Sequence, residues 1–279
     1  NCSIKMSYYK STNRYKCNYC GKQVHYTGKC SKCGSTNLIH SGKGIERVEE
    51  ELKKYFDVPM VKVDSDLSKN KDNFSKIYKD FLNKKYSILI GTQIIAKGLH
   101  FPDVTLVGVI NSDIILNFPD FRSGEKTFQL LTQVSGRAGR AGKKGKVIIQ
   151  TYEPENNVIK DSKEENYELF YNREINSRKV FSYPPFSKIL NIGFSSEDEK
   201  RLIEVSREFY EEIKNQDIEL YGPMPSMVYK VQKRYRMNIF AKGSRAKIDM
   251  FKRYLKKKLD EFNDGKVRIV VDIDPINLM

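Results

Sequence analysis

The stretch SILIGTQIIAKGLHFPDVTLVGVI, residues 87 to 110, decides the fold class of this chain. It contains two short apolar runs, at 87–91 and 104–110, each with the length of a buried strand. Continuous apolar runs are typical of strands that are covered on both faces, as in a parallel sheet. The stretch therefore predicts two strands of an α/β domain.

The segments on either side repeat the alternation of strand and helix. Upstream, apolar residues at helical spacing predict helices that begin near Ile45 and Phe74, with a strand over 60–63 between them. Downstream, we expect a helix over 125–135 and a strand over 146–151. Strands separated by helices imply right-handed crossovers and a parallel sheet covered on both faces.

A second region with a different order of elements follows a charged helical stretch at about 156–180. Pro184 and Pro185 mark the boundary. Beyond them, the runs ILNIGF, IELYG, MNIFAKG and VRIVVDI predict strands, with a turn expected at GPMP (222–225) and helices over the series that start at Leu202 and Ile248. The order β-α-β-β-α-β is that of a ferredoxin-like α+β fold.

Composition narrows the class of partner. The chain has 279 residues, with 50 Lys and Arg against 35 Asp and Glu, so its formal net charge is +15. This balance favours a polyanion such as nucleic acid, although a soluble protein can also simply be basic. The sequence has no apolar run of membrane-spanning length and no apolar core of a signal peptide. We therefore expect a cytoplasmic protein that does not bind a membrane.

The cysteines indicate a metal site within a cysteine-rich region at residues 1–40. Cys17 and Cys20 form one pair and Cys30 and Cys33 a second; each pair has two residues between its cysteines and is followed by Gly. Such turns let two thiolates face one cation, and zinc suits a tetrahedral thiolate set. The spacing predicts one zinc held by this local quartet, against the alternative of four free thiols.

Three further residues leave the ligand set open. His25 and His40 are alternative ligands or ordinary loop residues. Cys2 is either a free thiol or half of a pair whose other half is absent. In a reducing compartment, thiols or metal ligands are expected rather than disulfides.

Two other motifs suit phosphate-bearing ligands. GTQIIAKG (91–98) combines glycines that permit close backbone approach with short polar groups and one lysine, a set that fits a sugar-phosphate backbone or a structural turn. QVSGRAGRAG (133–142) presents two arginines three residues apart among small residues. SGKGIE (41–46) lacks the Ser or Thr and the upstream glycine of a phosphate-binding Walker A loop.

Together these segments resemble motifs V and VI of superfamily 2 helicases, and the likeness extends further. GTQIIAKGLHFPDVTLV, PDFRSGEKTFQLLTQVSGRAGR, CNYCG, CSKCGSTNLIHSGKGIERVEEEL and VDIDP are similar to the PriA family of primosomal replication-restart helicases (primosomal protein N′). The resemblance runs nearly end to end but covers only the C-terminal half of such a helicase. The first motor lobe, with its Walker A lysine and DExH acidic pair, has no counterpart here, so the chain is expected to be a fragment that is inactive alone.

The resemblance implies a role for individual residues. A two-lobe motor binds ATP with Mg between its lobes, so the second lobe would contribute arginines to the γ-phosphate. Relatives in the wider superfamily often have Asp at the position of one of the nucleotide contacts, His100. The implied set is Arg137 and Arg140 as catalytic residues, Gln133, Gly136 and His100 for nucleotide, and Thr92, Gln93, Lys97 and Gly98 for DNA.

The resemblance also implies a different zinc pairing. The family has eight cysteines in four nested pairs that bind two zinc ions. Carried over, Cys17 and Cys20 would share one ion with Cys2 and a cysteine upstream of the chain. Cys30 and Cys33 would need a pair that the chain lacks, and the local quartet remains the alternative for this fragment.

The resulting prediction has three parts: the cysteine-rich region (1–40), a RecA-like second helicase lobe (41–180) and a ferredoxin-like domain (181–279). The implied function is ATP-driven 3′ to 5′ unwinding that restarts stalled forks and begins primosome assembly. Expected partners are single-stranded and forked DNA, single-strand-binding protein and other primosome proteins. Basic stretches at 229–236 and 252–258 fit DNA contact or a solvated helix face. The competing hypothesis is a non-enzymatic zinc-ribbon module that binds nucleic acid.

Overall fold

The computed structural model describes residues 1–2, 6–9, 12–17, 19–30, 33–36, 44–63, 71–96, 99–136, 145–262 and 265–278. The chain divides into two compact units. One comprises Ile39–Ile175, and the other combines Asn1–Leu38 with Asn176–Met279. No helix in the described ranges is long and apolar enough to span a membrane.

Parallel strand pairs form the centre of the Ile39–Ile175 unit. Strand β4 (Met60–Val63) pairs in parallel with β5 (Ile88–Gly91), and β6 (Leu106–Val109) pairs in parallel with β7 (Lys146–Ile149). The predicted strands and their parallel direction are confirmed. Among the described residues, the ladder hydrogen bonds form two separate pairs rather than one continuous sheet.

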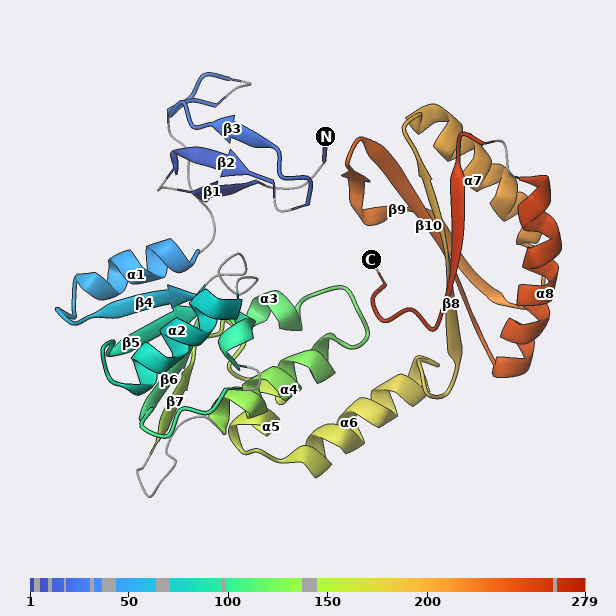
Figure 1. Cartoon of the computed structure of the whole chain (residues 1–279). Coiled ribbons are helices and arrows are strands. Elements are labelled where there is room, and N and C mark those ends of the chain that lie inside the picture. The colour runs from blue at the N-terminus through green and yellow to red at the C-terminus, as the bar shows by residue number, and fades with distance from the viewer. Residues whose placement is uncertain are drawn as a thin grey trace. The chain divides into compact units, whose positions relative to one another are not determined.

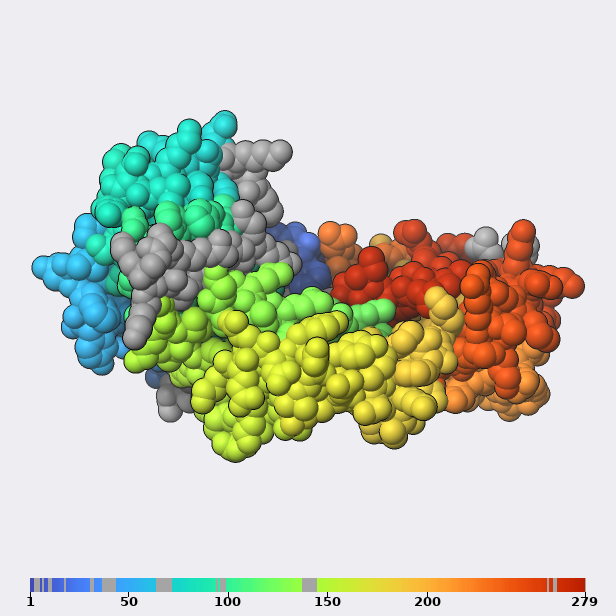
Figure 2. Space-filling model, turned by 90° about the horizontal axis from the view of Figure 1, so that it is seen from below, coloured from blue at the N-terminus to red at the C-terminus, as the bar shows by residue number. Residues whose placement is uncertain are grey.

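Helices alternate with these strands, as Figure 1 shows. The charged stretch predicted as one helical segment forms two helices, and the second of them starts after the turn at Glu165, which has a φ of 52°. Both lie at the surface seen in Figure 2, in yellow. The helices of this part of the chain are α1 (Ile45–Lys53), α2 (Lys71–Leu82), the short 3₁₀ helix η3 (Gln93–Ala96), α3 (Asp113–Leu116), α4 (Ser123–Ser135), α5 (Asn157–Lys163) and α6 (Tyr167–Val180).

Helix α4 is held by apolar packing along one face. Phe128, Leu131 and Val134 are buried at helical spacing. The Phe128 ring stacks on Phe170 of α6, with centroids 4.2 Å apart and planes 9° from parallel. This packing fixes which side of α4 faces solvent.

The C-terminal part of the other unit is a four-stranded antiparallel sheet with two helices on one face (Figure 1). The strands lie in the order β11-β8-β10-β9, and the chain order is β-α-β-β-α-β as predicted. Its elements are β8 (Lys188–Ser196), α7 (Glu199–Ile213), β9 (Glu219–Val231), β10 (Arg234–Gly243), α8 (Arg245–Glu261) and β11 (Arg268–Ile273).

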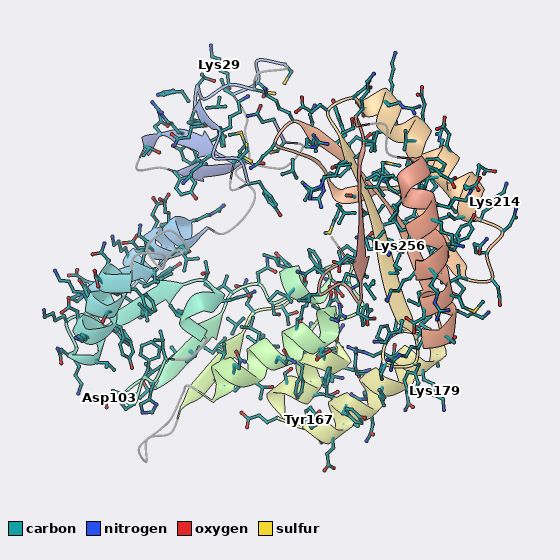
Figure 3. All side chains as sticks on the ribbon, turned by 45° about the vertical axis from the view of Figure 1, so that its right-hand side comes forward. Lys29, Asp103, Tyr167, Lys179, Lys214 and Lys256 are labelled. Atoms are coloured by element: carbon teal, nitrogen blue, oxygen red, sulfur yellow. The ribbon has the colours of Figure 1, made fainter. Side chains whose placement is uncertain are left out.

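The core of this sheet domain lies between the sheet and the helices. Alternate residues of β8, including Ile192 and Phe194, are buried against helical residues such as Phe209. The Phe209 ring meets Phe194 and Phe262 edge-on, with centroids 5.4 Å and 5.0 Å away. Lysines such as Lys214, which follows α7, lie exposed at the surface (Figure 3).

The prediction of a turn at GPMP (222–225) is wrong. Strand β9 continues through residues 222–225, and its hairpin with β10 turns at Gln232 and Lys233 instead. Proline cannot donate to a ladder, but β9 is an edge strand, and register shifts in its pairing accommodate Pro223 and Pro225. The basic stretch at 229–236 is therefore a β-hairpin tip.

The cysteine-rich region forms a small sheet of β1 (Ser7–Tyr9), β2 (Arg14–Lys16) and β3 (Gln23–His25), antiparallel in that order. Tyr8, Tyr15 and Tyr26 pack against one another, with ring centroids 5.0 to 5.6 Å apart. Burial and the neighbouring rings of Tyr26 and Tyr8 raise the pKa of Tyr15. This aromatic cluster is too small to serve as a full core, which is consistent with a need for metal.

Candidate functional site

The two cysteine pairs form turns with the same backbone hydrogen bonds. In each, the first cysteine donates its N–H to a carbonyl five residues later, and a glycine donates back to the carbonyl of that cysteine. The glycines adopt left-handed φ values of 71° and 70°, which other residues rarely tolerate. The bonds are Cys17 to Lys22 (2.9 Å) and Gly21 to Cys17 (2.9 Å), then Cys30 to Ser35 (2.8 Å) and Gly34 to Cys30 (2.9 Å).

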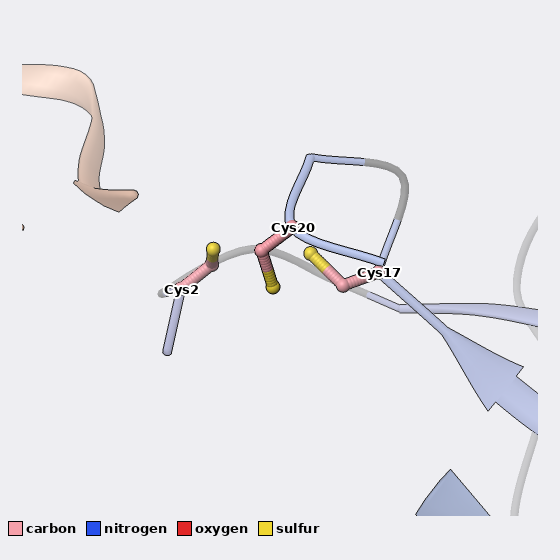
Figure 4. A group of neighbouring side chains, drawn as sticks. All are labelled: Cys2, Cys17 and Cys20. Carbon is pink, nitrogen blue, oxygen red and sulfur yellow. The ribbon is translucent and has the colours of Figure 1, made fainter. Parts of the chain in front are cut away.

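The first turn contributes to a cluster of three thiols. The sulfur atoms of Cys2, Cys17 and Cys20 all lie within 4.8 Å of one another (Figure 4). Tetrahedral zinc has Zn–S distances of about 2.3 Å, which places ligand sulfurs about 3.8 Å apart. Soft thiolates at this separation fit zinc, and the arrangement needs only a small contraction to hold it.

The structure does not gather the local quartet predicted from spacing. Within the described residues, Cys30 and Cys33 are not part of the thiol cluster, and Cys2 takes its place beside the first pair. The register of the β1–β2 hairpin is the reason. Ser7 pairs with Lys16, so the start of β1 lies beside the end of β2, directly before Cys17.

The environment of the thiols favours a thiolate at one position. Backbone hydrogen bonds from Cys20 and Tyr19 lower the pKa of Cys17 to about 7. At Cys2, the backbone N–H of Gln232 lowers the pKa, but burial and hydrogen bonds with the thiols of Cys20 and Cys17 outweigh it, and the pKa is raised. Cys17 is also the most buried cysteine, at 3% exposure.

A second candidate site lies in the Ile39–Ile175 unit, where β5 ends. Gly91 is required here because an added Cβ would lie 2.9 Å from Ile95 Cγ2 and 3.0 Å from the Val63 carbonyl oxygen. Thr92 and Gln93 follow directly and are exposed. Lys97 and Gly98 lie outside the described residues.

Helix α4 contacts η3, so the two motif segments are neighbours in space. Gln133 lies on the exposed side of α4, and Gly136 ends the helix by donating its N–H to the Thr132 carbonyl at 3.1 Å. Arg137 and Arg140 lie outside the described residues.

His100 is exposed and belongs to the loop after η3. Its backbone carbonyl accepts a hydrogen bond from the Tyr78 hydroxyl at 2.8 Å. Tyr78 and Phe81 of α2 also contact the buried Phe101 ring edge-on. His100 and Phe101 are therefore held against α2.

Three family models match the chain. The Primosomal protein N C-terminal domain matches residues 179–276, the Helicase conserved C-terminal domain matches residues 30–142, and the PriA DNA helicase Cys-rich region (CRR) domain matches residues 1–24. Together they match segments of both units and include the cysteine cluster.

Curated relatives match along the whole chain. The replication restart protein PriA of Bacillus subtilis is 38% identical over 284 residues, covering 100% of this chain and 35% of the relative. The protein of the same name from Borreliella burgdorferi is also 38% identical, over 100% of this chain and 42% of the relative. The Rickettsia conorii protein is 36% identical over 98% of this chain and 42% of its own length. The chain belongs to the PriA family.

The match is to one portion of PriA proteins. The chain spans 35% to 42% of the length of these relatives, and the matched portion contains the helicase C-terminal domain, the cysteine-rich region and the family's C-terminal domain. In this chain the structure brings η3 and α4 into contact. It also brings Cys2 to Cys17 and Cys20.

Sequence reasoning missed two buried carboxylates that position the PriA helicase segment. Asp120, whose side chain is fully buried, accepts the Arg122 N–H at 2.9 Å and pairs with Lys126 at 2.8 Å, which anchors the start of α4. Asp113 accepts hydrogen bonds from the Tyr152 N–H at 3.1 Å and the Thr151 hydroxyl. The detectable signal at Asp113 was an acidic residue at the first position of an apolar helix, DIIL (113–116).

Proposed function

We propose that the chain is the second motor lobe, cysteine-rich region and C-terminal domain of an ATP-dependent 3′ to 5′ DNA helicase that restarts stalled forks and initiates primosome assembly. The observation that carries this proposal is the end-to-end match to replication restart proteins. The contact of η3 with α4 supports it, because it would couple the segment proposed to bind DNA to the helix proposed to face the nucleotide.

The proposed nucleotide side of the lobe uses the end of α4. A first motor lobe would bind most of the ATP with its Mg, and Arg137 and Arg140 would approach the γ-phosphate from this lobe. Guanidinium stays charged and matches phosphate oxygens bidentately. Gln133 and Gly136 lie on the exposed side and end of the same helix and would contact nucleotide beside them, with His100 from the neighbouring loop.

The proposed DNA side uses the segment after β5. Thr92 and Gln93 are exposed there, and Lys97 and Gly98 continue the motif. Hydroxyl, amide and ammonium groups contact the sugar-phosphate backbone without reading sequence. The net charge of +15 suits single-stranded and forked DNA.

The cysteine-rich region and the C-terminal domain would support primosome assembly at the nucleoid in the bacterial cytoplasm. Zinc would be held by Cys2, Cys17 and Cys20 and would cross-link the cysteine-rich region, while Cys30 and Cys33 would contribute to a second zinc. We propose a ferredoxin-like domain at 181–279, supported by the strand order β11-β8-β10-β9. Its basic hairpin would meet DNA, and its surface would meet single-strand-binding protein or other primosome proteins.

The experiment is Arg137→Ala and Arg140→Ala in the full-length protein that joins this chain to a first motor lobe. By analogy with arginine fingers, each change should lower DNA-stimulated ATP turnover on the order of 10³-fold. Nucleotide affinity should fall much less. Arg207→Ala, on the exposed side of α7, is the matched control and should keep full turnover.

Two outcomes would contradict the proposed function. Turnover near the wild-type rate in both variants would refute the arginine assignment. A full-length protein that binds zinc and DNA but hydrolyses no ATP would favour the alternative, a non-enzymatic zinc-ribbon module.

A further inference from the structure

The β9–β10 hairpin tip has an unusual backbone. Its two turn residues, Gln232 and Lys233, both adopt left-handed φ values, 49° and 72°. A two-residue hairpin turn of this kind normally uses Asn and Gly, because other side chains are disfavoured at positive φ. Such outliers persist where the surroundings hold them, and they direct attention to a function.

Hydrogen bonds to α7 and β8 hold the hairpin tip in place. The Tyr229 hydroxyl donates to Glu199 at the start of α7 at 2.9 Å, and Arg234 donates to the Ser195 carbonyl at 2.8 Å. The Tyr229 and Tyr235 rings pack edge-on, with centroids 5.4 Å apart. The turn is thus presented on a rigid support.

In this turn, the N–H groups of the two central residues point outward and have no ladder partner. Both donate to the start of the cysteine-rich region instead. The Lys233 N–H donates to the Asn1 carbonyl at 2.7 Å, and the Gln232 N–H donates to the sulfur of Cys2 at 3.2 Å. All of these residues belong to one compact unit.

Cys2 is one of the three clustered thiols, so the second bond reaches a proposed metal ligand. An N–H donor to a thiolate sulfur stabilises the charged form that binds metal and fixes its orientation. The hairpin turn therefore has the geometry of an outer-shell donor to the thiol cluster.

We propose that the turn at Gln232 and Lys233 is an outer-shell component of the zinc centre, and that it latches the cysteine-rich region to the C-terminal domain. The inference rests on the proposed zinc site. Zinc binding at Cys2 would strengthen the latch, and the latch would slow zinc release.

Amide hydrogen exchange of the unmodified 279-residue chain tests the latch without any substitution. The Gln232 and Lys233 amides should be protected when zinc is bound and should exchange about 10-fold faster or more after chelation, because each loses its hydrogen-bond acceptor. The Ile239 amide, within the β8–β10 ladder, should not change. Equal exchange of the turn amides with and without zinc would overturn the proposal.

Zinc release to a chromophoric chelator gives an independent measure. Insertion of two glycines between Gln232 and Lys233 moves both amides, and release should become about 10-fold faster or more. The control Gln232→Asn with Lys233→Gly keeps the same turn type and both amides, and its release rate should match the unmodified chain.

The outcomes separate the two proposals. Zinc bound by the chain but released equally fast from the insertion variant and the control would refute the latch alone. Purified chain without zinc would refute the proposed metal site and the latch with it.

Discussion

Gly91→Ala should disturb the junction between β5 and η3. The new Cβ would lie 2.9 Å from Ile95 Cγ2, 3.2 Å from Ile95 Cδ1 and 3.0 Å from the Val63 carbonyl oxygen. Carbon atoms prefer separations of about 3.5–4.0 Å, so η3 must shift away from β4. Overpacking of this kind costs about 1–3 kcal/mol.

The measurement is amide hydrogen exchange in the β4–β5 ladder. The chain has no Trp to report on this unit by fluorescence, and a chain of two units need not unfold in one step. A cost of about 2 kcal/mol would speed exchange of the ladder amides roughly 30-fold. Because Thr92 follows Gly91, affinity for single-stranded DNA should fall as well.

Two further variants make the test decisive. Gly108→Ala, in the neighbouring strand β6, places its Cβ in open space and should leave exchange unchanged or slower. Ile95→Ala removes two of the three crowded atoms, so the double variant with Gly91→Ala should be less destabilised than the sum of the single changes. Exchange in Gly91→Ala that matches Gly108→Ala would refute the steric argument.

Three other predictions concern ion pairs, pH and metal. Arg173→Ala should lower the free energy of unfolding by about 1–3 kcal/mol, because the buried Asp161 carboxylate, 2.7 Å from Arg173, would lose its cation. The control Lys160→Ala breaks only an exposed ion pair and should change thermal stability little. Burial and donation to Glu199 raise the pKa of Tyr229 to about 12. The contribution of Tyr229 to the free energy of unfolding should therefore be complete below its ordinary pKa of about 10 and should be lost as the pH rises towards 12. Tyr229→Phe should remove this pH dependence when unfolding is measured across that range. Zinc chelation should unfold the cysteine-rich region and leave the parallel strand pairs folded, as followed by regional hydrogen exchange, and simultaneous loss of both would contradict independent stability.

Local patterns in the sequence were sufficient for most of the helices and strands. The strand at 60–63 has the bounds of β4, and the helix predicted over 125–135 begins only two residues earlier in the structure. Apolar periodicity determines these elements because burial of one face, or of both, selects the residue types directly. The CxxCG turns were also readable, since glycine adopts the left-handed conformation after the second cysteine at the lowest cost.

Contacts between distant residues were decided by the tertiary structure. Cys2 joins Cys17 and Cys20, and the β1–β2 register places the start of β1 beside the residue before Cys17, whereas spacing alone favoured the local quartet. The edge position of β9 lets a proline-containing segment remain in a strand, so the hairpin turn moves to Gln232 and Lys233. That shift places two amides against Asn1 and Cys2, about 230 residues away in sequence. Periodicity reports on a residue and its near neighbours, whereas a ligand set depends on which strands pair, and pairing is a property of the folded chain.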